Sequence, residues 1–224
     1  MKKQFILYYI VTAVLFSFNS CKTENEPIIE TQEVYLPMSV GNYWIYQHYI
    51  VDSLGYETPL NSFDSVVITN DTLINNKLYY EFGGRHNNTH FHKFLRDSVG
   101  YFVTDNGNKC FSSFNFKDIL YKQNDSLEFN KMNRLIFTLK IKMESVPEIK
   151  TTAAGEFNTL NARGYLTTYY YDSSARLVDT IIASQNTYYA KNVGIIVQEY
   201  HYYNDMREYK RKFEKRLIRY KLKD

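Results

Sequence analysis

The sequence predicts a mostly β protein, with a single antiparallel meander that forms a curved sheet, half-barrel or barrel after an N-terminal signal peptide. Three observations lead to this fold class. Tyrosine and phenylalanine are abundant, at 22 and 15 of 224 residues, and aromatic side chains favour strands. Short segments of alternating apolar and polar residues recur between turn-forming residues. Amphipathic segments with helical spacing are scarce.

The first 20 residues have the organisation of a secretory signal. Two lysines precede an apolar run over residues 5–18, and the small or polar Asn19 and Ser20 follow it. This run is shorter than the roughly 20 apolar residues that a helix needs to cross a bilayer. Residues 1–20 are therefore predicted to be a cleaved signal peptide.

Cys21 stands at the predicted cut point. Residues 15–22 resemble the lipobox of bacterial lipoproteins, in which the cysteine thiol takes a diacylglyceryl group, a peptidase cuts before the cysteine and the new amino terminus is acylated. Ser20 matches the small residue before the cut. Several acyl chains anchor stably, at about 0.8 kcal/mol per buried CH₂. The alternatives are an ordinary signal peptide that ends at a cysteine, and an uncleaved anchor.

The lipobox resemblance also implies a location. Lys22 follows the cysteine, so the acidic signal that retains some lipoproteins in the inner membrane is absent. The resemblance therefore implies an outer-membrane lipid anchor, on the periplasmic face or the cell surface. If Cys21 carries lipid, Cys110 is left as a lone thiol, which we expect to be buried as a small apolar residue. The rival reading is a Cys21–Cys110 disulfide, which requires an unlipidated Cys21.

Charge and composition divide the rest of the chain into a tether and a domain. Without residues 1–20 the net charge is +1, so nothing indicates nucleic acid as a partner. Residues 21–36 are polar and rich in glutamate, and we expect a flexible tether that spans about 20–25 Å. Residues 37–224 are predicted to form one β domain, large enough for a well-packed core.

The predicted strands begin at residues 43–51, where Trp44, Tyr46, His48 and Ile50 share one face. Residues 135–144 alternate most clearly. Predicted turns lie at Asn70-Asp71 or Asn75-Asn76, at Asp97-Ser98 and at residues 105–108. The further predicted strands are residues 63–69, 77–82, 90–95, 100–104, 157–171, 187–190, 195–203 and 215–222.

A recurring triplet of Asp, then Ser or Thr, then an aliphatic residue marks further predicted turns, because Asp-Ser and Asp-Thr favour turns. These triplets resemble the O-glycosylation acceptors of Bacteroidota envelope proteins. They begin at Asp52, Asp64, Asp71, Asp97, Asp125 and Asp179.

Three stretches resemble a family of uncharacterised Bacteroidota lipoproteins. Residues 36–46 resemble their P-x-x-x-G-N-x-W-x-Y opening, residues 153–157 their A-G-x-F motif, and residues 189–196 (Y-A-x-x-V-G-I-I) a motif near the last strands. The resemblance implies an antiparallel β fold of unassigned function. Its motif residues have structural roles, because glycine permits turns and close approaches and tryptophan anchors cores. These residues are Gly41, Trp44, Tyr46, Gly155, Phe157 and Gly194.

Three histidines, His86, His90 and His92, are the candidate metal ligands. On a strand His90 and His92 point the same way, so two imidazoles could share a zinc ion with His86. The alternative is a polar strand entrance with solvated histidines. A metal site here would make an envelope hydrolase or another metal-dependent enzyme possible.

Clusters of tyrosine are the candidate ligand site, because aromatic faces stack on sugars and other flat or amphipathic ligands. The residues concerned are Tyr169, Tyr171, Tyr200 and Tyr202. Alternatively, these rings cover the flanks of the sheet with their hydroxyls in water.

Residues 207–224 form a basic run with nine basic and three acidic residues. Such a patch could contact anionic lipid headgroups. However, Ile218, Tyr220 and Leu222 alternate with basic residues, which is the pattern of a strand with one solvated face.

The sequence contains no Gly-x-Ser-x-Gly, His-Glu-x-x-His, Cys-x-x-Cys or phosphate-binding Gly-rich motif. No catalytic residue and no cofactor is predicted. The first hypothesis is a lipid-anchored, non-catalytic binding or scaffolding domain, with the membrane and an envelope protein, glycan or lipid ligand as partners. The second is a carrier for an apolar ligand, which a cavity of a few hundred Å³ would favour. The third is the enzyme that uses His90 and His92.

Overall fold

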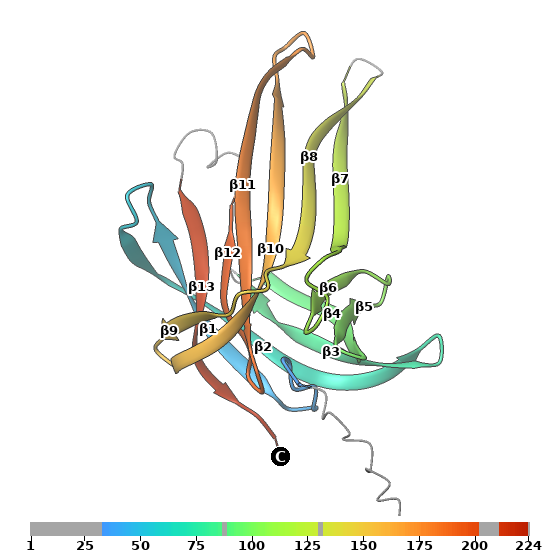
Figure 1. Cartoon of the computed structure of the whole chain (residues 1–224), viewed down its shortest axis with the longest axis vertical. Coiled ribbons are helices and arrows are strands. Elements are labelled where there is room, and N and C mark those ends of the chain that lie inside the picture. The colour runs from blue at the N-terminus through green and yellow to red at the C-terminus, as the bar shows by residue number, and fades with distance from the viewer. Residues whose placement is uncertain (1–32, 87–88, 130–131, 202–210, 224) are drawn as a thin grey trace, which may run out of the picture. The chain divides into compact units, whose positions relative to one another are not determined.

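A computed structural model describes residues 33–86, 89–129, 132–201 and 211–223. These residues form an all-β domain (Figure 1). No helix in this part of the chain is long and apolar enough to span a bilayer. The strands are β1 (Tyr43–Val51), β2 (Glu57–Ile74), β3 (Lys77–His86), β4 (Thr89–Ser98), β5 (Tyr101–Thr104), β6 (Lys109–Ser112), β7 (Ile119–Phe129), β8 (Met132–Met143), β9 (Glu148–Thr152), β10 (Gly155–Tyr171), β11 (Leu177–Ala190), β12 (Gly194–Tyr200) and β13 (Lys212–Lys221).

The strands form one antiparallel sheet in the order β6-β5-β4-β3-β2-β1-β13-β12-β11-β10-β8-β7, and β9 pairs with β10 beside this path. Strands β6 and β7 lie at the two edges and contact each other, so the sheet nearly closes into a barrel. Figure 1 shows β7, β8, β10 and β11 rising above the curved β2–β6 part. The predicted antiparallel meander is confirmed.

Several predicted boundaries are correct and others are wrong. Strand β1 covers the predicted residues, and the second hairpin turns at Asn75-Asn76, whose φ values of 51° and 59° suit a tight hairpin. The turn predicted at Asp97-Ser98 lies two residues later, at Val99-Gly100, because Asp97 and Ser98 still pair with β5.

The Asp-Ser and Asp-Thr triplets are mostly not turns. Asp52 does begin a turn, in which its Oδ1 accepts hydrogen bonds from the N–H groups of Leu54 and Tyr56. The other five aspartates lie within β2, β4, β7 and β11. Pairing with neighbouring strands has overridden the local turn preference of these residues.

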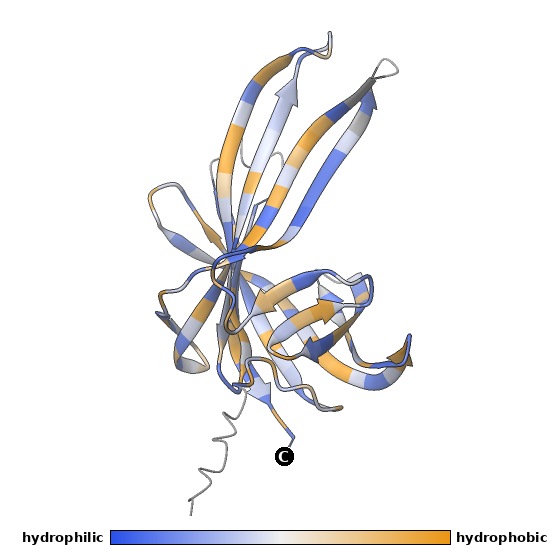
Figure 2. Ribbon diagram, turned by 45° about the vertical axis from the view of Figure 1, so that its right-hand side comes forward, coloured by the Kyte–Doolittle hydropathy of each residue, from blue (hydrophilic) through white to orange (hydrophobic). Residues whose placement is uncertain are grey.

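Apolar and polar bands alternate along the upright hairpins (Figure 2), as expected for strands with one inward face. The inward face is centred on Trp44, which is 1% exposed. Its indole N–H donates to the carbonyl of Val193 at 2.6 Å, and the Tyr46 hydroxyl donates to the carbonyl of Ile195 at 3.1 Å. These bonds connect the predicted opening motif to the motif near the last strands.

Two glycines permit close approaches in this core. Gly194 has φ of 114°, and a Cβ there would lie 3.0 Å from Leu36 Cδ1 and 3.2 Å from Trp44 Nε1. At Gly84, a Cβ would lie 1.8 Å from the carbonyl oxygen of Ser65 on β2. Leu36, placed by the sequence at the end of the tether, is buried in this core.

Candidate functional site

The concave face of the sheet contains a pocket of about 390 Å³. Its walls are mainly apolar, and side chains from both halves of the meander contribute to them. A larger hollow of about 710 Å³ is lined by turn residues such as Asn75, Asp105 and Gly107, so it lies outside the core. The apolar residues that line the inner pocket are Leu36, Trp44, Tyr46, Val66, Phe82, Phe91, Leu95, Phe102, Ile141, Ala162, Tyr189 and Ile195.

Strand register places a row of polar side chains along one wall of the pocket. Lys215 of β13 lies opposite His48 of β1 on one side and Gln198 of β12 on the other. Gln198 lies opposite Thr187 of β11. Directly paired residues in a sheet share one face, so the register brings this row onto the concave face. Lys215, Gln198 and Thr187 line the pocket itself.

A buried acid and histidine support Lys215. Asp64 and His48 have side chains that are 1% exposed, and Asp64 Oδ1 lies 2.8 Å from His48 Nε2. His48 Nδ1 lies 2.9 Å from the Tyr200 hydroxyl, and Asp64 Oδ2 lies 3.9 Å from Lys215 Nζ. One oxygen of the Asp64 carboxylate therefore lies near His48 and the other lies near Lys215.

Lys93 of β4 is the second cation of the pocket. Its side chain lines the pocket and is exposed to solvent, so it lies at the open side of the pocket. Its Nζ lies 5.9 Å from the centre of the Phe82 ring, a cation–π contact. Burial lowers the pKa of Lys93, and the nearby Cys110 acts weakly in the opposite direction.

Burial also changes the proton affinity of the other groups in the pocket. It lowers the pKa of Lys215 to about 8; the charge of Lys93 adds to this effect, and the charge of Asp64 opposes it. Burial raises the pKa of the Cys110 thiol and of the Tyr46 and Tyr189 hydroxyls. These three groups are therefore neutral near pH 7, and the ionisable charge of the pocket belongs to its two lysines and Asp64.

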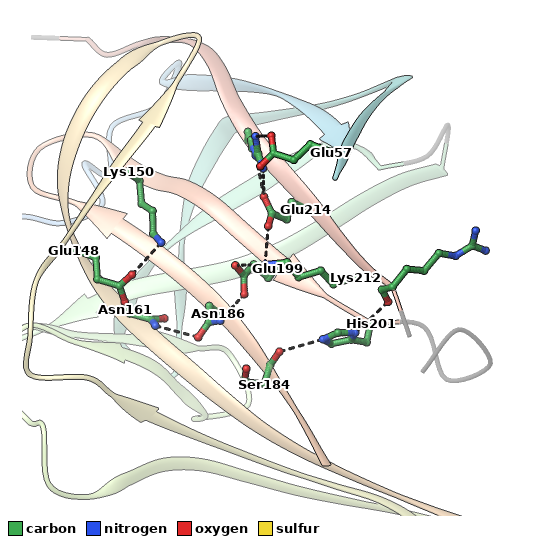
Figure 3. A network of polar contacts seen from close by, with 12 residues as sticks. Glu57, Glu148, Lys150, Asn161, Ser184, Asn186, Glu199, His201, Lys212 and Glu214 are labelled. Atoms are coloured by element: carbon green, nitrogen blue, oxygen red, sulfur yellow. Dashed lines mark hydrogen bonds and ion pairs between the residues drawn. The ribbon is translucent and has the colours of Figure 1, made fainter. Parts of the chain in front are cut away.

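The opposite face of β13 contains a second polar cluster, which we call the outer network (Figure 3). Lys212 lies 2.9 Å from Glu199 and 2.8 Å from Glu214. Arg216 donates to both carboxylate oxygens of Glu57 at 2.6 Å, and its Nε donates to Glu214 at 2.8 Å. The network continues through Glu199, Asn186 and Asn161 across β12, β11 and β10. Its charges are paired, which indicates a structural role.

The predicted metal ligands lie at the β3–β4 hairpin. His86 is opposite Thr89, and His90 is opposite Arg85. Phe91 and Lys93 line the pocket, so His90 and His92 lie on the other face of β4, where both are exposed. In the described ranges, no group of three or more His, Cys, Asp or Glu side chains is arranged to hold a metal ion.

The predicted tyrosine site is distributed over separate places. Tyr169 and Tyr171 lie near the end of β10, where the Tyr171 hydroxyl donates to the Leu135 carbonyl at 2.9 Å. Tyr200 lies beside His48 on β12, and Tyr202 is outside the described residues. None of the three described tyrosines is among the residues that line the pocket. A ligand site at these tyrosines therefore stays a prediction.

Cys21 is also outside the described residues, whereas Cys110 is a free thiol on the pocket wall.

The sequence did not identify Lys93, Lys215 or Asp64 as site residues. One signal was available: Phe91, Lys93 and Leu95 alternate, which puts a lysine on an otherwise apolar face. The basic run at 207–224 contained Lys215 but was considered only as a surface patch.

Comparison with known proteins shows that this fold recurs. One crystal structure, of a protein described as a putative lipoprotein from Parabacteroides distasonis, has a TM-score of 0.53 at 16% identity over 84% of this chain and 99% of that chain. Another, described as a putative exported protein with a YmcC-like fold from Bacteroides fragilis, has a TM-score of 0.46 at 14% identity over 85% and 100%. No protein-family model and no curated protein matches. The chain thus shares its fold with the protein described as a putative lipoprotein.

Proposed function

We propose that this chain is a lipid-anchored, non-catalytic binding protein of the cell envelope, and that its β domain carries an apolar ligand. The observation that supports the carrier role is the pocket of about 390 Å³ on the concave face, with mainly apolar walls. Small-molecule sites in proteins are typically concave and apolar, at about 300–1,000 Å³, with a few polar groups that fix the orientation of the ligand.

The lipid anchor rests on the signal-like residues 1–20 and on Cys21 at the predicted cut point. The fold similarity to a protein described as a putative lipoprotein agrees with it. Mass spectrometry of the chain from its native host tests the anchor. We expect an amino-terminal Cys21 that carries acyl chains, whereas an intact Met1 or an unmodified Cys21 terminus would contradict the anchor.

Binding of a neutral apolar probe tests the carrier role. Trp44 is the single tryptophan of the chain and lines the pocket, so its fluorescence reports on occupancy. We expect 1-N-phenylnaphthylamine to bind the full chain saturably and to quench Trp44. Thr187→Met adds bulk inside the pocket and should weaken binding. The same change at Thr180, an exposed residue of the same strand, serves as the control. Equal binding by both variants, or no binding at all, would refute the carrier role.

A further inference from the structure

The charges that line the pocket do not balance. Among the described residues that form its walls, two are lysines, Lys93 and Lys215, and one is an acid, Asp64. Asp64 already has His48 at 2.8 Å and Lys215 at 3.9 Å. Lys93 has the face of the Phe82 ring near it, and no carboxylate is within ion-pair distance in the part of the chain that the structure describes. The lining of the pocket therefore carries excess positive charge.

This arrangement favours an anion at the two lysines. An ammonium group that leaves water for apolar surroundings loses solvation that only a partner charge or hydrogen bonds restore. The lowered pKa values of both lysines have this same physical cause. In the outer network, by contrast, Lys212 and Arg216 each touch carboxylates at 2.5–2.9 Å. The cations of the outer network are therefore paired with carboxylates, whereas those of the pocket have fewer such partners.

The remaining walls suit an apolar tail. Trp44, Phe82 and Phe102 are at most 2% exposed and lie on these walls. The apolar surface also continues beyond the pocket. Ile141 lies on the wall, and Leu139, Phe137 and Leu135 follow it at alternate positions of β8, all half-buried. Alternate residues of a strand share one face, so an apolar stripe leads from the pocket along the upright hairpin.

We propose that the pocket binds an amphipathic anion, whose carboxylate or phosphate head lies at Lys93 and Lys215 and whose apolar tail lies against the aromatic walls and the β8 stripe. This inference rests on the proposed carrier function and adds the class of ligand. A carboxylate and a phosphate ester share the property that matters, a compact anionic head that accepts charge-assisted hydrogen bonds from ammonium groups.

Four probes with the same twelve-carbon tail test the proposal on the full chain by Trp44 fluorescence and calorimetry. They are dodecanoate, dodecyl phosphate, dodecanol and dodecyltrimethylammonium. At pH 7 we expect at least one anion to bind about tenfold or more tightly than dodecanol, because hydrogen bonds to charged groups contribute that much. The stronger of the two anions identifies the head group as carboxylate or phosphate.

Lys93→Met and Lys215→Met test the assigned residues. Each variant should lose about tenfold in affinity for the preferred anion and keep the wild-type affinity for dodecanol. Lys221→Met, at an exposed position of β13, is the matched control and should change neither affinity. Circular dichroism verifies folding, and the four-probe series on the wild type does not depend on any variant.

The outcomes separate the two proposals. If dodecanol or the cationic probe binds as tightly as both anions, the anionic-head inference fails while the carrier function stands. If no probe binds and 1-N-phenylnaphthylamine also fails to bind, the carrier function fails with it. If an anion binds preferentially but Lys93→Met and Lys215→Met both retain that preference, the assignment of the two lysines is wrong.

Discussion

Strand β13 places basic residues in two different surroundings. On its outer face, Lys212 and Arg216 contact Glu57, Glu199 and Glu214. Burial alone would lower the pKa of Lys212, but hydrogen bonds to Glu214 and Glu199 raise it overall. On the inner face, Lys215 has one carboxylate at 3.9 Å, and burial lowers its pKa to about 8.

The contrast between the two faces separates cations with a structural role from cations that are available to a ligand. The cations on the two faces differ in the number of carboxylates that they contact. A cation with two carboxylates is part of the framework, and its removal leaves buried acids unpaired. A cation without enough partners costs stability in the empty protein, and binding of an anion compensates for this cost. The following predictions test this difference, from the largest expected effect to the smallest.

Loss of the central acid of the outer network should have the largest effect. Glu214 is 6% exposed and lies between Lys212 and Arg216. We expect Glu214→Gln to lower the free energy of unfolding by about 3 kcal/mol, because it removes the buried carboxylate that the partly exposed Lys212 and Arg216 share. Urea unfolding measures this change. Glu156→Gln, at an exposed position, should stay within about 0.5 kcal/mol of wild type. Equal effects of both substitutions would show that the network is not structural.

The pH dependence of stability should reveal Lys215. Its pKa is about 8 in the folded chain and about 10.5 for an ordinary lysine in the unfolded chain, so between these pH values the unfolded chain binds the proton and the folded chain does not. Stability from this group therefore rises as pH increases from 8 to 10.5, by up to about 3 kcal/mol. The free energy of unfolding of the wild type minus that of Lys215→Met, measured across this pH range, isolates the contribution of Lys215.

A flat difference across this window would contradict the assigned environment of Lys215. Comparison with Lys215→Met at each pH is necessary, because other ionisable groups lie in or beside the same pocket. They are Lys93 of β4, Asp64 of β2, Tyr46 and His48 of β1, Tyr189 of β11 and Cys110 of β6.

Removal of the inner cation Lys93 should have the opposite sign to removal of Glu214. We expect Lys93→Met to raise the free energy of unfolding by up to about 1 kcal/mol, because an ammonium beside apolar walls, without a carboxylate partner and partly screened by water, becomes an apolar side chain of similar length. Thermal and urea unfolding of delipidated protein provide the measurement. Destabilisation by a similar amount would mean that Lys93 already has a favourable partner.

The rim of the outer network should contribute least. Glu57 is half exposed, at 49% of its side chain, although Arg216 donates to both of its oxygens. Exposed ion pairs contribute little because water screens them, so we expect Glu57→Gln to cost about 0.5 kcal/mol. An effect as large as that of Glu214→Gln would show that burial does not rank the network's members.

The fold could be predicted because alternation and hairpin turns are local signals. Strand β1 and the Asn75-Asn76 turn follow from a few neighbouring residues. Strand β7 was missed because its sequence, ILYKQNDSLEF, is mostly polar at an edge of the sheet. Edge strands need no apolar alternation when one side faces water. Strands β6 and β9, of four and five residues, were also missed.

The site could not be predicted because it depends on pairing between distant strands and on one bulge. If the alternation of residues 218–222 is extended back along the strand, Lys215 falls on the same face as Arg219, which is exposed. The register shifts between Leu217 and Arg219, so Ile218 is an extra residue. The shift reverses the phase and places Lys215 inward with Leu217, which is fully buried. Only the β1–β13 pairing brings Lys215 beside Asp64.

That same β1–β13 ladder sets the order in which the sheet can assemble. Among the described residues, all the remaining strand pairs join strands that are consecutive in sequence or separated by a single strand. Strands β1 and β13, by contrast, are separated by nearly the whole domain. Ladders between neighbours close short loops at low entropic cost, and the long loop is cheaper to close once they exist. We therefore expect two ribbons, β1–β6 and β7–β13, to form before the β1–β13 ladder. Because this ladder creates the wall that carries Lys215, we expect the pocket to be completed late in folding.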